Sequence, residues 1–171
     1  ILLAQNDSKI ICVVINDHEK YEKRVLQDAF VVGSIDYLAE VIEQTGFFMM
    51  LKKTNNIQDI VRYASMWNMA GLVLIGFCEQ DYMYLRNHMR IPFVVYDGFC
   101  ENPERIVTIT IDDFDGGAQV GALLKKNGHT QALCISDNDI SMDRKRMDGF
   151  KSTFGEEQTQ IMIVPMYKEE R

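Results

Sequence analysis

The sequence predicts an α/β protein built on a doubly wound, mainly parallel sheet. Short apolar runs of strand length alternate along the chain with segments of helical period. These runs are apolar at nearly every position, which is typical of strands buried on both faces of a sheet. Strands and helices also follow one another at a spacing that favours βαβ units with right-handed crossovers.

The first strand and helix have the clearest patterns. Residues 10–16 (IICVVIN) form an apolar run that ends on a polar asparagine. The polar stretch 17–28 predicts an unusually long loop or a short extra helix. A helix is expected over 30–45, because one apolar stripe runs along it at helical spacing. Its members are Val31, Ile35, Leu38 and Ile42. Gly46 follows the last turn, where glycine can adopt the left-handed backbone.

The remaining elements continue this alternation. Residues 47–51 predict the second strand. Asn56 is placed to cap the helix over 57–67, with Asp59 three residues later to accept from free backbone donors. The helix over 81–89 ends before Pro92, because proline disfavours helix in the residue that precedes it. The other expected strands are 71–77, 93–96, 106–111, 131–136 and 161–164, and the other helices are 115–127 and 140–154.

Composition and charge narrow the function classes. The chain is 47% hydrophobic and 25% charged, as in ordinary globular domains, and its net charge is −7. Such an acidic balance argues against a nucleic-acid-binding surface, which concentrates Lys and Arg. No apolar run approaches the roughly 20 residues that span a bilayer, and no signal peptide is recognisable. The scattered, unpaired cysteines predict reduced thiols in a cytosolic protein: Cys12, Cys78, Cys100 and Cys134.

Several segments carry a family likeness in a consistent order. Residues 111–135 read IDDFDGGAQVGALLKKNGHTQALCI, and residues 143–154 read DRKRMDGFKSTF. Earlier in the chain, GLVLIGF begins at Gly71 and IPFVVYD begins at Ile91. With these segments the chain resembles the lactose-repressor (LacI/GalR) family of bacterial transcriptional regulators over nearly its whole length.

The resemblance implies a type I periplasmic-binding-protein-like body. Residues 1–9 would be the tail of a hinge, residues 10–128 the N-terminal lobe, and residues 129–171 the beginning of a C-terminal lobe whose remainder is absent. It also implies a homodimer that contacts DNA only through a helix-turn-helix head missing from this chain. One departure concerns the start of the first helix, where the family has Asn-Pro followed by two aromatics. Here Asp28-Ala29-Phe30-Val31 has no proline and only one aromatic.

The resemblance also indicates ligand contacts. Arg146 occupies the position of the effector-contacting arginine in the motif Arg-x-x-Gly-Phe, and its fork of donors suits vicinal hydroxyls or a carboxylate. Asp115 precedes Gly116-Gly117, where the family often has a polar contact. The alternatives are a solvated helix arginine for Arg146 and a carboxylate that favours the helix dipole for Asp115.

Further candidates follow from their places at the carboxyl ends of strands, where ligands of such sheets bind. Asp97 could accept from a hydroxyl or simply form a turn. Phe30, at the helix start where the resemblance implies an aromatic, could stack on a sugar ring or base, or belong to the core. The other candidates, each with a loop, cap or core role as its alternative, are Thr54, Asn55, Phe77 and Asp137.

No pattern predicts catalysis, a metal or a cofactor. His18, His88 and His129 lack metal-ligand spacing, and no nucleophile elbow or phosphate-binding glycine loop is present. Gly116-Gly117 is too short a signal for a dinucleotide site and is better explained by close packing. We therefore expect a protein that is not an enzyme.

The second expected strand carries a hypothesis of its own. Residues 46–51 read GFFMML, yet this strand is expected at the edge of the sheet. An exposed edge that apolar would favour aggregation. We therefore expect this edge and the helix before it to be buried in a homodimer.

The function expected from these observations is effector sensing by a cytoplasmic transcriptional regulator. A small molecule, a sugar or a related compound, would bind in the cleft between the lobes and change how the DNA heads sit. The alternatives are a secreted or periplasmic solute-binding protein and a sensor module fused to a signalling enzyme. The fold by itself does not decide among them.

Overall fold

The computed structural model describes residues 8–17, 25–100, 106–139 and 141–164. The chain forms two compact units, residues 1–110 and residues 111–171. The proposed hinge tail lies mostly outside the described residues, as do His18 and most of the long loop expected before the first helix.

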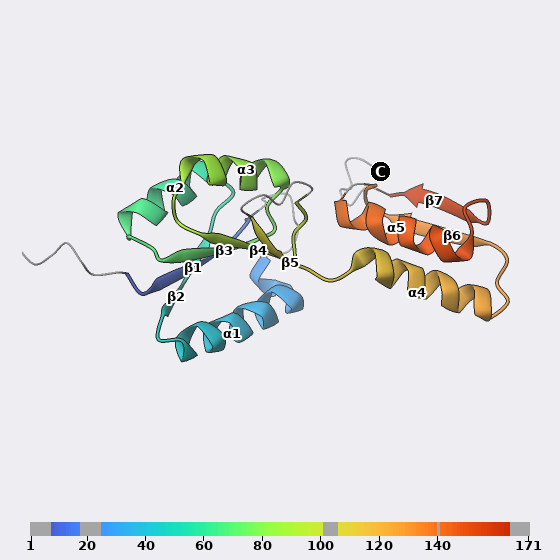
Figure 1. The fold of residues 1–171 in the computed structure, drawn as a ribbon, viewed down its shortest axis with the longest axis horizontal. Coiled ribbons are helices and arrows are strands. Elements are labelled where there is room, and N and C mark those ends of the chain that lie inside the picture. The colour runs from blue at the N-terminus through green and yellow to red at the C-terminus, as the bar shows by residue number, and fades with distance from the viewer. Residues whose placement is uncertain (1–7, 18–24, 101–105, 140, 165–171) are drawn as a thin grey trace, which may run out of the picture. The chain divides into compact units, whose positions relative to one another are not determined.

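The first unit contains the five-stranded parallel sheet that the sequence predicts (Figure 1). The strand order is β2-β1-β3-β4-β5, and every neighbouring pair is parallel. The first strand lies inside the sheet because both neighbours pair with it, whereas β2 lies at the edge, as expected. The strands are β1 Ile10–Ile15, β2 Phe48–Lys53, β3 Gly71–Ile75, β4 Phe93–Tyr96 and β5 Val107–Ile109.

Helices cover both faces of this sheet. On one face α1 (Ala29–Gln44) packs with Val13, Ile15 and Ile75, and a short 3-10 turn, Val25–Gln27, precedes it. On the other face α2 (Ile57–Met66) and α3 (Glu79–His88) pack against strand side chains such as Leu74 and Val95. Alternate strand residues point to opposite faces, so these continuous apolar runs are buried by both layers.

Local signals set most helix boundaries as expected. The Asp28 side chain caps α1 by accepting from the amides of Phe30 and Val31. Asn56 caps α2 by accepting from the amide of Gln58 at 3.0 Å. The third helix begins at Glu79, two residues before the expected start, because the Asp81 side chain accepts from the amide of Cys78 and so closes an extra turn.

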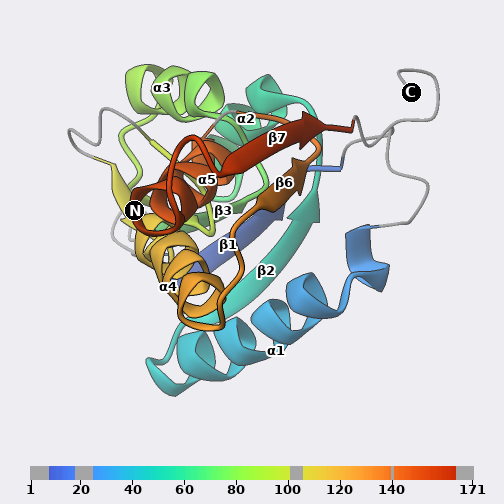
Figure 2. The same cartoon turned by 90° about the vertical axis from the view of Figure 1, so that its right-hand side faces the viewer.

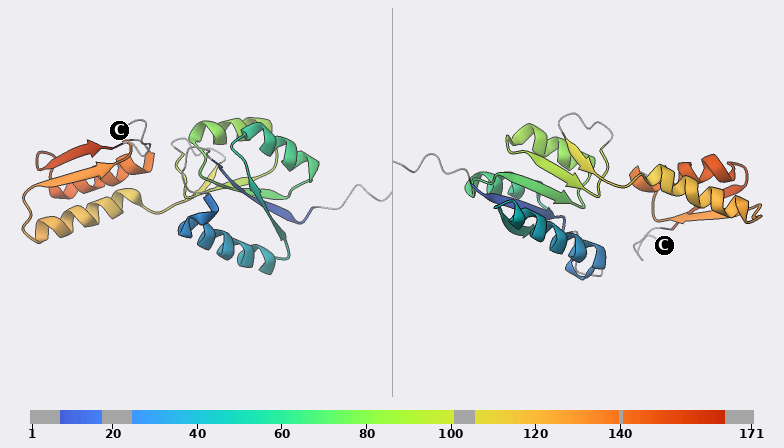
Figure 3. Two further views of the ribbon diagram at one scale, coloured as in Figure 1. Left: turned by 180° about the vertical axis from the view of Figure 1, so that it is seen from behind. Right: turned by 60° about the horizontal axis from the view of Figure 1, so that its bottom comes forward.

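The second unit consists of two helices and a two-stranded parallel sheet (Figure 2). Its elements are α4 Asp113–Lys126, β6 Ala132–Ser136, α5 Ser141–Phe154 and β7 Thr159–Ile163. Figure 3 shows both helices on the same side of the strands. Apolar side chains remain exposed on the strands, among them Leu133, Ile135 and Met162.

The division between the units falls earlier than the sequence suggested. The expected boundary lay between Gly128 and His129, at the end of α4, whereas the compact units divide between Thr110 and Ile111. The reason is that α4 packs along α5, with Gly117 and Gly121 facing the backbone of α5. No helix among the described residues is long and apolar enough to cross a membrane.

Candidate ligand-binding residues at the carboxyl ends of the strands

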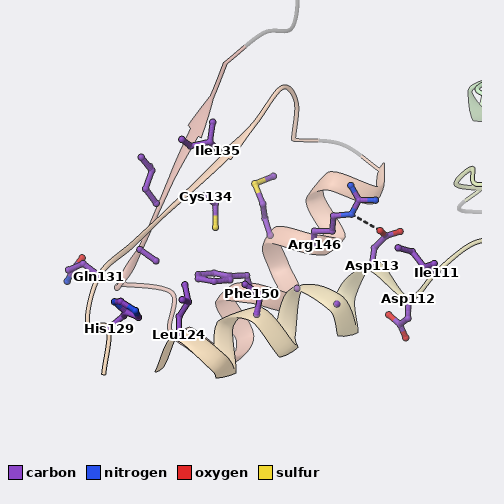
Figure 4. A pocket seen from close by; sticks show the side chains of 16 residues that line it. Ile111, Asp112, Asp113, Leu124, His129, Gln131, Cys134, Ile135, Arg146 and Phe150 are labelled. Atoms are coloured by element: carbon purple, nitrogen blue, oxygen red, sulfur yellow. Dashed lines mark hydrogen bonds and ion pairs between the residues drawn. The ribbon is translucent and has the colours of Figure 1, made fainter. Parts of the chain in front are cut away.

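An ion pair joins the two helices of the second unit. Arg146 on α5 donates from Nε to Oδ1 of Asp113 at 2.7 Å (Figure 4). Asp113 is the first residue of α4 and is only 4% exposed. The Arg146 side chain is about half exposed, and its Nη1 lies 3.3 Å from Oδ1 of Asp143. A buried carboxylate therefore fixes the direction of a guanidinium that still reaches the surface.

Glycines permit this close approach of the helices. A Cβ atom at Gly117 would collide with the backbone oxygen of Arg146, and one at Gly149 would collide with that of Phe114. Gly116, in contrast, has no neighbour within 4 Å of its Cβ position. Close packing, which the sequence suggested for Gly116-Gly117, is thus confirmed for the second glycine alone.

Asp115 lies beside this ion pair in sequence but has different partners. Its amide donates to the Asp112 side chain at 2.9 Å, which caps α4. Its exposed carboxylate accepts from Nε2 of Gln119 at 2.6 Å. The sequence pointed to Asp115 and missed Asp113 and Asp143. The available signals were the i,i+3 spacing of Asp143 and Arg146 and the acidic pair that opens α4.

Asp137 lies just beyond the carboxyl end of β6, as predicted. It accepts from Nδ2 of Asn138 at 2.8 Å, and the same nitrogen donates to Asp143 at 2.9 Å. The Asn138 amide thereby links the strand end to the first turn of α5. Through Asp143 this polar group is continuous with Arg146.

A cavity of about 570 Å³ lies beside these residues within the second unit. Its body is apolar, formed by side chains of α4, β6 and α5 that include Val120, Leu133 and Phe150. One end carries Arg146 and Asp113, and the other carries His129 and Gln131, as Figure 4 shows. Neither Asp115 nor Asp137 lines it.

The first unit presents an aromatic pair at its own carboxyl edge. Phe30, 53% exposed, stacks on Tyr96 at the end of β4, with ring centroids 6.3 Å apart and an angle of 24° between the planes. The hydroxyl of buried Ser34 lies 3.3 Å from that of Tyr96 and holds this ring. Val31, which replaces the family's second aromatic, packs into the core instead. Sequence reasoning missed Tyr96, because nothing in the chain order places β4 beside the start of α1.

The other predicted residues of this unit differ in burial and in backbone conformation. Thr54 accepts from the amide of Asn56 at 3.1 Å, and neighbouring Asn55 is exposed. Asp97 has a positive φ of 50°, the conformation of a turn. Phe77 is 8% exposed and belongs to the core, which is the alternative role expected for it from the sequence.

The chain was compared with protein-family models, with curated proteins and with solved structures, and only the solved structures gave matches. No family model matches the chain, and no curated protein matches it. A LacI transcriptional regulator from Lactobacillus brevis is 15% identical with a TM-score of 0.71, and the match covers 91% of this chain and 58% of that one. A CelR transcriptional regulator in complex with cellobiose is 15% identical with a TM-score of 0.72, over 92% of this chain and 51% of that one.

A third solved structure is similar to this chain to the same degree. The ribose operon repressor from Lactobacillus acidophilus is 20% identical with a TM-score of 0.70, over 95% of this chain and 59% of that one. This chain has the fold of LacI-type effector-binding domains. It spans between 51% and 59% of the lengths of these three proteins.

Asp97 and Asp137 directly follow the carboxyl ends of β4 and β6, which is where open α/β sheets bind ligands. Among the described residues, no three His, Cys, Asp or Glu side chains are grouped so that they could hold a metal ion. These residues can donate hydrogen bonds from a fixed guanidinium, accept hydrogen bonds at carboxylates, and stack a ligand on aromatic rings.

Proposed function

We propose that this chain is the effector-sensing region of a LacI-type transcriptional regulator and binds a sugar or a closely related small molecule. The observation that carries the proposal is the ion pair between Arg146 and buried Asp113. A half-exposed guanidinium fixed by a buried carboxylate is a preorganised donor for hydroxyl groups.

Further contacts are proposed for each unit separately. In the first unit Phe30 and Tyr96 would stack on the apolar face of a sugar ring, and in the second unit Asp137 would accept from a hydroxyl. Asp115 and Asp97 remain proposed acceptors, with Thr54 and Asn55 as peripheral contacts. Phe77 would act only as a core residue behind the strand end. The cellobiose complex among the solved structures supports a sugar as the ligand class.

We propose that ligand binding controls a DNA head outside this chain. A ligand that binds one conformation of the regulator more tightly shifts the population toward it, and the DNA heads respond. On this proposal the protein works in the cytoplasm and catalyses no reaction. The three solved structures compared above are transcriptional regulators, which supports both statements.

The lobe assignment is also a proposal. The first unit would belong to the N-terminal lobe and β6 onward to the C-terminal lobe. The exposed apolar residues of β6 and β7 and the apolar body of the cavity suit further polypeptide of that lobe, and the longer solved structures support such an extension. Covering these side chains would supply the core that a two-stranded sheet lacks.

A homodimer is proposed from the edge strand. On β2, Phe48 is 71% exposed and Leu51 is 39% exposed, and on the helix before it Tyr37 is 66% exposed. An apolar, hydrogen-bonding edge of this kind is normally covered or blocked by charge. A second copy of the chain would cover it symmetrically.

Thermal unfolding of the full-length protein that contains this chain tests the sensor proposal. A ligand selective for the native state adds RT ln(1 + [L]/Kd), about 2.7 kcal/mol at a hundredfold excess over Kd. We expect one sugar in a panel of free sugars, sugar phosphates and nucleobases to raise the midpoint, and Arg146→Ala to abolish that rise. A panel in which no compound raises the midpoint would contradict the proposal.

A further inference from the structure

The charges around Arg146 restrict the class of ligand. We infer that the ligand presents hydroxyl donors and carries no negative charge, so that a free sugar is bound and its phosphorylated form is rejected. This inference rests on the proposed function, since it takes Arg146 and its neighbours as ligand contacts.

The positive charge of Arg146 is already matched. Asp113 accepts from Nε at 2.7 Å and Asp143 lies 3.3 Å from Nη1, so one guanidinium has two carboxylate partners. A phosphate or carboxylate on the ligand would have to compete with both of them. The guanidinium can still donate a hydrogen bond to a neutral hydroxyl, because it has five N–H groups.

The positive ends of the helix dipoles are matched as well. A free helix N-terminus attracts anions, and two helices begin in this region. The first of them, α4, is capped by Asp112 and has Asp113 and Asp115 in its first turn. The other, α5, has Asp143 in its first turn. The first turn of each helix therefore carries protein carboxylates, whose negative charge opposes the binding of an anionic ligand there.

The other charged side chains near Arg146 leave this region with a net negative charge. Arg144 is paired with Asp139 at 2.7 Å. The starts of α4 and α5 and the end of β6 together carry six carboxylates against three cations (Arg144, Lys145 and Arg146), a formal charge of −3. Ionised carboxylates only accept hydrogen bonds, so they pair with hydroxyl donors and repel an oxyanion. The six carboxylates are those of Asp112, Asp113, Asp115, Asp137, Asp139 and Asp143.

Calorimetric titration of the full-length protein with matched pairs of ligands tests the inference. The probes are glucose, ribose, xylose and cellobiose, each against its phosphate ester. We expect the free sugar of the pair that binds to have at least about a tenfold lower Kd than its phosphate. Tighter binding of the phosphate would overturn the inference and leave the proposed function standing. Failure of every probe to bind would overturn the proposed function and the inference together.

A charge variant separates electrostatics from shape. Asp143→Asn removes one carboxylate beside Arg146, and Asp148→Asn makes the same change at an exposed position of the same helix. We expect the first variant to narrow the preference for the free sugar by about threefold to tenfold, and the second to leave it unchanged. Equal preferences in both variants, with unfolding midpoints like that of the parent protein, would overturn the electrostatic explanation.

Discussion

Nε of Arg146 donates to Oδ1 of Asp113 across 2.7 Å, and it joins a half-exposed cation to a carboxylate that is almost fully buried. The pair therefore has two roles, one in the packing of α4 against α5 and one in directing the guanidinium. Each role can be tested separately, because one variant can disturb the helix packing and another the ligand contact.

Replacing Arg146 by Ala should destabilise the second unit, because Asp113 would remain buried without its cation. We expect a loss of about 1–3 kcal/mol in the free energy of unfolding, measured by urea denaturation. The matched control is Arg144→Ala, which breaks the exposed pair with Asp139 and should cost less than about 1 kcal/mol. Equal losses in the two variants would show that the burial of Asp113 is not what matters.

Gly149→Ala should be strongly destabilising, because the new methyl group would collide with the backbone oxygen of Phe114. Overpacking of this kind costs about 1–3 kcal/mol, which thermal unfolding would detect. Gly116→Ala is the control, since its Cβ position is open and alanine favours helix by up to about 1 kcal/mol. A neutral Gly149→Ala variant would mean that the two helices pack less closely than this contact requires.

The aromatic pair should matter for binding more than for folding. We expect Phe30→Ala and Tyr96→Ala each to weaken sugar binding by about threefold to tenfold, because each removes part of a stacking surface. Titration calorimetry on the full-length protein measures the change. Trp67→Ala, which removes an exposed aromatic ring at the end of α2, should bind the ligand normally. Parental affinity in both Phe30→Ala and Tyr96→Ala would exclude the pair from the site.

A charge on the β2 edge should prevent the proposed dimer. Phe48→Glu places a carboxylate in the middle of an apolar interface, where an unpaired charge is costly. Light scattering at micromolar concentration should then report a monomer, whereas Met66→Glu, 64% exposed on α2, should leave a dimer. A parent protein that is already monomeric would contradict the dimer proposal.

Stability should fall at alkaline pH because of Cys12. Burial raises the pKa of this thiol from 9.0 to about 11. The folded state keeps the proton over that range while the unfolded state loses it, so the stabilisation is complete below pH 9.0 and is lost as the pH rises toward 11. Urea denaturation between pH 8 and pH 11 should show a loss on the order of 1–3 kcal/mol. Cys12→Val, which carries no thiol, should reduce this loss.

The order of the elements could be predicted from local patterns. The apolar runs gave all the strands to within about two residues, and side-chain caps such as Asn56 marked helix starts. These features depend on neighbouring residues and on the spacing of apolar residues along the chain, and both can be read directly from the sequence. The edge position of β2 also followed from chain order, since it matches the expected doubly wound topology.

The sequence by itself determined the α/β alternation, and it predicted candidate contacts at the strand ends and at Arg146. Only the tertiary structure decided which of these residues lie together. It paired Arg146 with Asp113, brought Tyr96 beside Phe30, and assigned α4 to the second unit. The physical reason is that such pairs lie many residues apart in sequence and meet through helix packing and sheet order, which local periodicity does not encode.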